Sequence, residues 1–77
     1  MVFEKVREVI SSQLGISEDK IKLTTSLTDD LGADSLDIFQ VVSELEEIFD
    51  LEFSNEDAEK IKLISDVVQY IEDRIED

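Results

Sequence analysis

Apolar residues recur at helical spacing in four stretches of the chain, with polar residues between them. The first stripe, in residues 2–14, consists of Phe3, Val6, Ile10 and Leu14, with Val2 and Val9 at its edge. A spacing of three to four residues predicts an amphipathic helix whose apolar face packs on a core. Gly15 follows where a left-handed residue commonly ends a helix.

The second stretch, residues 35–50, has the longest apolar stripe. We expect its buried residues to be Leu36, Val42, Leu45 and Phe49, flanked by Ile38, Val41 and Ile48. The last stretch, residues 64–76, has a stripe of Ile64, Val68, Ile71 and Ile75, with Val67 and Tyr70 beside it. Ser65 is a candidate N-cap for that helix.

A short helix is predicted between these two, within residues 51–62. Ser54 can cap its first turn, with Asp57 three residues later in a capping-box pattern. Ala58 and Ile61 should face inward, and Leu51 and Phe53 should anchor the preceding loop.

Residues 16–34 form a long connection, which is uncommon unless it carries local structure or function. Two four-residue patterns, beginning at Ser17 and Ser26, are each typical of one capped helical turn. Its apolar anchors should be Ile16, Ile21, Leu23, Leu27 and Leu31. The expected fold is all-α: an antiparallel four-helix bundle, three helices longer and one short, with a long ordered loop between the first two. Residues 1–77 should form one domain with a radius of gyration of about 11–12 Å.

Charge narrows the classes of partner. The net charge is −14, and residues 23–59 contain twelve acidic residues and no Lys or Arg. We expect no nucleic-acid partner and no membrane insertion, because binding to nucleic acid or to an anionic membrane surface favours the opposite sign of charge. A basic protein surface or divalent cations would be attracted instead.

The chain has no Cys and no His. Thiol nucleophiles, imidazole bases and the usual transition-metal ligands are therefore missing, so an enzyme is the least favoured class. No apolar run is long enough to span a membrane, and no secretory signal pattern is present. We expect a cytoplasmic monomer.

Residues 31–37 read Leu-Gly-Ala-Asp-Ser-Leu-Asp and lead into the second helix. Asp34 is a good N-cap, and Asp37 lies in the first turn, where the helix dipole favours negative charge. Ser35 is thus held at the mouth of a helix, close to solvent. A phosphate group is electrostatically well placed at such an N-terminus.

These seven residues resemble the attachment signature of acyl carrier proteins, together with Leu45-Glu46-Glu47-Ile48-Phe49-Asp50 and Ala58-Glu59-Lys60-Ile61 at the family's spacing. The resemblance covers nearly the whole chain. It implies that a transferase moves 4′-phosphopantetheine from coenzyme A onto Ser35 with Mg²⁺, and that Asp34 takes part in recognition by that transferase. The thiol of the arm would carry growing acyl chains as thioesters to the enzymes of fatty acid synthesis.

The resemblance also implies a partner-binding face read by basic patches on those enzymes: Asp34, Leu36, Asp37, Glu44, Glu46, Glu47 and Glu59. The acyl chain would be sheltered near Val42, Leu45, Phe53 and Ile61. Gln40 stands where an acid is usual in the family, and Ser43 where Met or another apolar residue is usual. Both departures concern partner choice.

Other functions remain open from the residues alone. The chain could be a specialised carrier for polyketide, peptide, sugar-lipid or D-alanyl transfer. It could be a helical adaptor in which Ser35 is only a cap. Divalent cations could bind Asp29, Asp30, Asp34 and Asp37, but the loop lacks EF-hand spacing, so binding should be weak and not specific.

Overall fold

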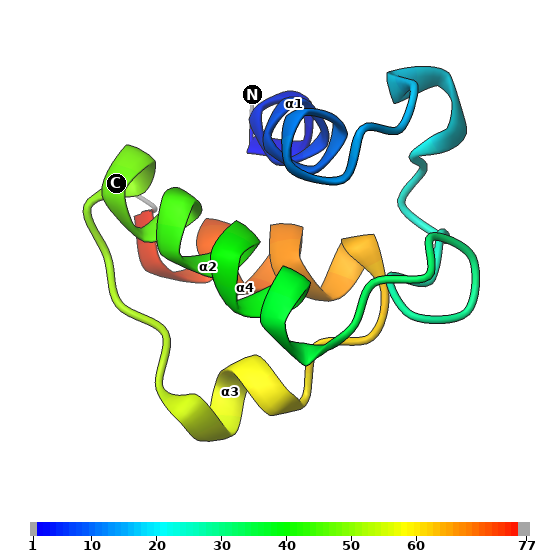
Figure 1. Ribbon diagram of the computed structural model, residues 1–77. Helices are drawn as coiled ribbons and strands as arrows, with labels where there is room; N and C mark the ends of the chain where they lie inside the picture. Colours follow the sequence, from blue (N-terminus) through cyan, green and yellow to red (C-terminus); the bar gives the residue numbers. More distant parts are fainter. Residues whose placement is uncertain (1, 76–77) are drawn as a thin grey trace.

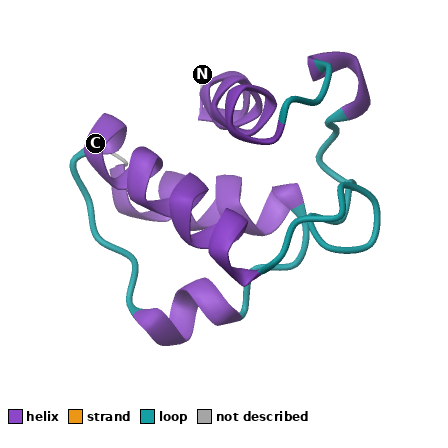
Figure 2. Ribbon diagram, in the orientation of Figure 1, coloured by secondary structure: helices purple, strands orange, loops and turns teal. Residues whose placement is uncertain are grey.

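A computed structural model describes residues 2–75 (Figures 1 and 2). The elements in chain order are α1 (Val2–Leu14), the 3₁₀ turn η1 (Glu18–Lys20), α2 (Ser35–Phe49), α3 (Asn55–Glu59) and α4 (Ile64–Ile75). The predicted helical bundle of three longer helices and one short helix is confirmed. Residue 76, expected at the end of the last helix, lies outside the described part of the chain.

The three longer helices enclose the core. Helix α1 packs against both α2 and α4, and Figure 1 shows α1 end-on while the other two run across the view. Helices α2 and α4 run in the same sense and are not antiparallel to each other as expected, because the connection through α3 carries the chain back along α2 before α4 begins. The radius of gyration is 11.2 Å, inside the expected range.

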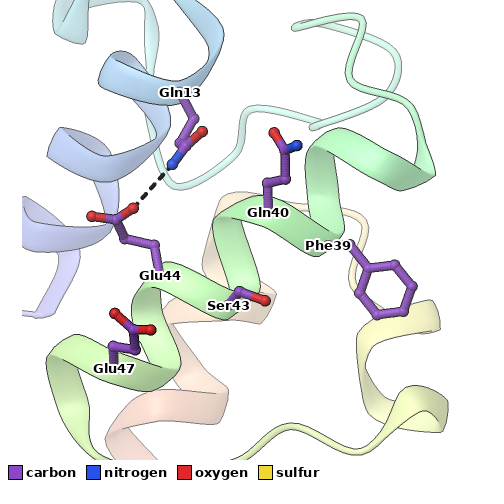
Figure 3. Close-up of a pocket in the computed structure, with 6 residues that line it drawn as sticks. All are labelled: Gln13, Phe39, Gln40, Ser43, Glu44 and Glu47. Carbon is purple, nitrogen blue, oxygen red and sulfur yellow. Dashed lines mark hydrogen bonds between the residues drawn. The ribbon is translucent and has the colours of Figure 1, made fainter.

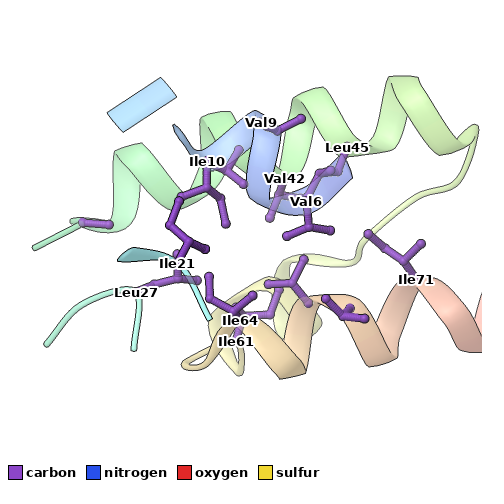
Figure 4. Close-up of a cluster of buried hydrophobic side chains, with 14 of the residues drawn as sticks. Val6, Val9, Ile10, Ile21, Leu27, Val42, Leu45, Ile61, Ile64 and Ile71 are labelled. Atoms are coloured by element: carbon purple, nitrogen blue, oxygen red, sulfur yellow. The ribbon is translucent and has the colours of Figure 1, made fainter. Parts of the chain in front are cut away.

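The centre of the core is aliphatic (Figure 4). Side chains with no more than 1% exposure come from α1, the long loop, α2 and α4: Val6, Ile10, Ile21, Leu27, Leu45, Ile64, Val67 and Ile71. Burial of one such side chain stabilises a fold by about 1.5–3 kcal/mol. The loop between α1 and α2 is therefore part of the core.

Helix ends follow local capping chemistry. Gly15 ends α1 with a φ of 68°, as predicted, and Asp50 ends α2 with a φ of 54°. Ser17 and Ser54 cap η1 and α3, as predicted. The prediction of Ser65 as the N-cap of α4 is wrong, because Ser65 lies inside the helix. The Asp66 carboxylate instead accepts the backbone N–H groups of Lys62 and Leu63, both at 3.0 Å.

The loop 16–34 is ordered by its own hydrogen bonds and by the chain near α4. Ser26 Oγ accepts the Asp29 N–H at 3.0 Å, which confirms the predicted capped turn. The Leu27 N–H donates to the Lys62 carbonyl at 2.9 Å, within a single antiparallel bridge between Ser26 and Leu63. This bridge ties the loop to the start of α4.

The prediction that Leu23 and Leu36 belong to the core is wrong. Leu23 is 44% exposed, because its segment is held by its backbone: the Leu23 carbonyl accepts the Ser65 N–H. Leu36 is 64% exposed, because the buried residues of α2 are confined to its middle, at Val41, Val42 and Leu45. The first turn of α2 therefore extends beyond the core.

Candidate functional site at the start of α2

Ser35 is the first residue of α2 and is exposed to solvent. Asp34 caps the helix: its Oδ1 accepts the Asp37 N–H at 2.9 Å, and Asp37 Oδ2 accepts the Asp34 N–H at 3.2 Å. This reciprocal capping box fixes the direction in which the chain enters the helix. The Ser35 side chain is consequently presented at the positive end of the α2 dipole.

A glycine turn brings the chain to Asp34. Gly32 has a φ of 69°, which L side chains rarely adopt, and its N–H donates to the Thr28 carbonyl at 3.1 Å. The next residue, Ala33, is buried and donates to the Leu27 carbonyl at 2.9 Å. Two consecutive hydrogen bonds to Thr28 and to buried Leu27 thus fix the residues that precede Asp34.

A pocket of about 510 Å³ opens beside Ser35, between α2 and the α3 segment, and we call it the α2–α3 pocket. Its apolar lining comes from Ile38, Phe39, Ala58 and Ile61, and Glu59 and Lys62 also line it. Of the residues expected to shelter an acyl chain, Ile61 lines this pocket. The other three, Val42, Leu45 and Phe53, are buried in the core cluster.

Most of the expected partner-binding residues are accessible. Leu36, Glu44, Glu47 and Glu59 are exposed, and Asp37 is half-buried. Glu46 differs, because its Oε2 accepts the Phe53 N–H at 2.7 Å and its side chain secures the loop after α2. That bond gives Glu46 a structural role within the chain.

Sequence reasoning missed Phe39, which is 51% exposed. Phe39 lines the α2–α3 pocket and also a second pocket of about 410 Å³ between α1 and α2 (Figure 3). Gln40 and Ser43 line this second pocket, and Gln13 closes one side by donating to Glu44 Oε1 at 3.0 Å. The sequence did contain a signal for this role, because Phe39 is an aromatic residue that lies outside the predicted apolar stripe.

Three of the four carboxylates considered for divalent cations already accept backbone N–H groups. Asp30 Oδ2 accepts the Ser26 N–H at 2.8 Å, and Asp34 and Asp37 cap α2. Within residues 2–75, no three acidic side chains converge as ligands for a metal ion.

A second polar cluster, also missed, lies behind α3. The Tyr70 hydroxyl donates to Asp57 Oδ2 at 2.9 Å and lies 3.2 Å from the Glu52 carbonyl oxygen. The hydrogen bond from Tyr70, then that from Ser54, and the nearby Arg74 hold the pKa of Asp57 below its ordinary value. Burial, then the bond to Asp57, raises the pKa of Tyr70.

Comparison with known proteins identifies the family. Residues 4–71 match the family model described as "Phosphopantetheine attachment site". An acyl carrier protein of Clostridium acetobutylicum is 52% identical over 77 residues, which is all of both chains. The chain belongs to the acyl carrier proteins. A second acyl carrier protein, from Bdellovibrio bacteriovorus, is 52% identical over 71 residues, covering 92% of this chain and 91% of that one.

The solved structure of a putative acyl carrier protein from Mycobacterium tuberculosis shares the fold of this acyl carrier protein. The TM-score is 0.83 at 38% identity, over 90% of this chain and 92% of the other. The carrier therefore bears phosphopantetheine and holds acyl groups for other enzymes, and it is not itself the catalyst. Family membership implies interaction with a phosphopantetheinyl transferase and with enzymes of fatty acid synthesis. Within residues 2–75, no helix has the length and apolarity needed to cross a membrane.

Proposed function

We propose that Ser35 is the residue that bears the phosphopantetheine, in a single carrier domain of residues 1–77. The observation that supports this is a division of roles among serines. Ser17, Ser26 and Ser54 each accept a backbone N–H through Oγ and so cap a turn or helix. At α2 that role belongs to Asp34, so the Ser35 hydroxyl is not needed for capping.

The residues around Ser35 fit the group. Ser35 is exposed, so a transferase can reach Oγ, and it also lines the α2–α3 pocket. The phosphate lies at a helix N-terminus, where the dipole stabilises negative charge. The bound phosphopantetheine supplies the thiol that this Cys-free chain lacks. Ile38, Phe39 and Ala58 offer an apolar lining that shields a short acyl chain from water.

Fatty acid synthesis is the pathway that the carrier serves, and reconstitution tests this assignment. With this chain as the only carrier, purified enzymes of dissociated fatty acid synthesis should elongate an acyl primer. A chain that is modified but fails to elongate, while another carrier succeeds in the same mixture, would contradict the assignment. That result would favour a specialised carrier for polyketide, peptide, sugar-lipid or D-alanyl transfer.

Partner enzymes bind the acidic surface of α2 and α3 through basic patches, and the carrier is a monomer of the cytoplasm. Support comes from the exposed carboxylates of Glu44, Glu47 and Glu59 in a segment without basic residues. Complementary charge mainly raises the rate of association and makes it salt-dependent.

Charge reversal tests this surface. Glu47→Lys should lower kcat/KM of the transferase roughly tenfold at low salt, with a smaller loss at high salt. Glu4→Lys makes the same charge change on α1, where Glu4 is exposed, and serves as the matched control. Equal losses for the two variants would show that net charge matters and the proposed surface does not.

A further inference from the structure

Helix α3 is too short to be stable alone. It has five residues, and isolated helices shorter than about 12 residues are marginal in water. Its position therefore depends on contacts with the rest of the chain. Figure 1 shows α3 on the outside of the bundle, apart from α1. This position matters because Ala58 and Glu59, both in α3, line the α2–α3 pocket.

Four side chains behind α3 contact one another and form a cluster, which we call the Tyr70 cluster: Phe53, Asp57, Tyr70 and Arg74. The Tyr70 ring stacks on Phe53, with centroids 4.1 Å apart and an interplanar angle of 17°. The Arg74 guanidinium lies 3.6 Å from the Tyr70 ring centroid and 3.9 Å from Asp57 Oδ2. Tyr70 of α4 thus contacts α3 through Asp57 and the preceding loop through Phe53.

We propose that Tyr70 is a positioning residue that holds α3 through Asp57, and so sets the wall of the pocket in which the acyl chain is sheltered. Ile61 connects the two sides, because it lines the α2–α3 pocket and also the shallow surface bounded by Asp57 and Tyr70. This inference rests on the proposed function of the pocket beside Ser35.

The proposed role belongs to the hydroxyl group of Tyr70, and it does not depend on the aromatic ring. Tyr70→Phe keeps the stack on Phe53 and the contact with Arg74, and removes the hydroxyl contacts with Asp57 Oδ2 and with the Glu52 carbonyl. Asp57→Asn keeps an acceptor for the hydroxyl, whereas Asp57→Ala removes it. Gln69→Ala is the matched control, since it removes an exposed hydrogen bond to Asp73 on the same helix.

The first measurement is amide exchange in the chain without phosphopantetheine. The Ala58 N–H bonds to Ser54 and the Ile61 N–H bonds to Ala58. Exchange at these two amides should be about tenfold faster in Tyr70→Phe and Asp57→Ala, and near wild type in Asp57→Asn and Gln69→Ala. Unchanged exchange at α3, or equal acceleration in every helix, would overturn the proposal.

The second measurement is the rise in melting temperature when an eight-carbon acyl group is loaded. A merely structural role lowers the melting temperature of loaded and unloaded protein equally, so the rise is unchanged. A positioning role makes the rise smaller in Tyr70→Phe, with recovery in Asp57→Asn. An unchanged rise in Tyr70→Phe, or no rise in wild type, would overturn the inference. A chain that gains no phosphopantetheine mass would instead contradict the proposed function, and amide exchange would still test the positioning of α3.

Discussion

Two connecting segments supply walls of the α2–α3 pocket, and they are held in different ways. The loop 16–34 contributes Thr28 and Asp29, and it is anchored by Ile21 and Leu27, each 1% exposed. The segment 50–63 contributes Ala58, Glu59, Ile61 and Lys62, and its position depends in part on polar contacts with Tyr70. Both segments contribute buried residues, but α3 in the second segment also depends on the hydrogen bond from Tyr70 to Asp57.

The difference predicts which wall of the pocket is easier to displace. Replacing a buried aliphatic anchor by Ala costs about 2–5 kcal/mol, whereas a single hydrogen bond contributes about 0.5–1.5 kcal/mol. Ser35 follows the strongly anchored loop, so its position should vary little. Loss of the hydrogen bond from Tyr70 to Asp57 should displace α3 at a lower cost than the loss of a buried loop anchor.

Removal of a loop anchor should have the largest effect. Ile21→Ala should lower the free energy of unfolding by about 2–4 kcal/mol, because the side chain is fully buried. Urea denaturation measures this loss. Leu23→Ala, at a 44% exposed residue of the same loop, is the control and should cost less than about 0.5 kcal/mol. Similar losses for both would mean that the loop is not held by burial.

A backbone change in the same loop should have an intermediate effect. Gly32→Ala should cost about 1–2 kcal/mol, because φ is 69° there and an L residue is strained in that conformation. A Cβ would meet no atom within 4 Å, so no clash adds to the strain. Thermal unfolding gives the loss, and a neutral result would mean that the turn before Asp34 relaxes freely.

A change in the second segment should have a smaller effect of opposite sign. Asp50 ends α2 with a φ of 54°, a conformation that Gly adopts without strain. Asp50→Gly should therefore raise the free energy of unfolding by roughly 0.5–1 kcal/mol. The same urea titration measures it. A loss of stability would show that the Asp50 side chain makes a contact worth more than the strain.

Acid should remove the charge of Asp57, and with it the contribution of that charge to stability. The pKa of Asp57 is lowered by the bonds from Tyr70 and Ser54, so its contribution to stability is present above its ordinary value of 3.8 and is lost as pH falls through the folded value. The difference in melting temperature between wild type and Asp57→Asn should shrink as the pH falls below about 4. A difference that is constant from neutral pH to pH 2 would show that the charge of Asp57 does not matter.

Features set by neighbouring residues could be predicted from the sequence. The last residue of α1 follows from Gly15, and the first residue of α2 follows from Asp34, because capping involves residues three or four positions apart. Exposure of Ser35 followed from the same reasoning. The bundle itself followed from the apolar stripes.

Features set by distant residues could not be predicted. The positions of Leu23 and Leu36 depend on which parts of each segment meet the core, and helical spacing does not contain that information. The bond from Tyr70 to Asp57 joins residues 13 positions apart and depends on how α3 lies on α4. The bond from the Phe53 N–H to Glu46 joins residues seven positions apart and is likewise not visible in the sequence.

The most direct test of the central claim is peptide-level mass spectrometry after incubation with coenzyme A, Mg²⁺ and a broad-specificity phosphopantetheinyl transferase. We predict a gain of one phosphopantetheine on the peptide containing Ser35, no gain in Ser35→Ala, and a normal gain in Ser54→Ala. Modification of another serine, or none in a folded sample, would contradict the assignment and leave Ser35 as an ordinary first residue of α2.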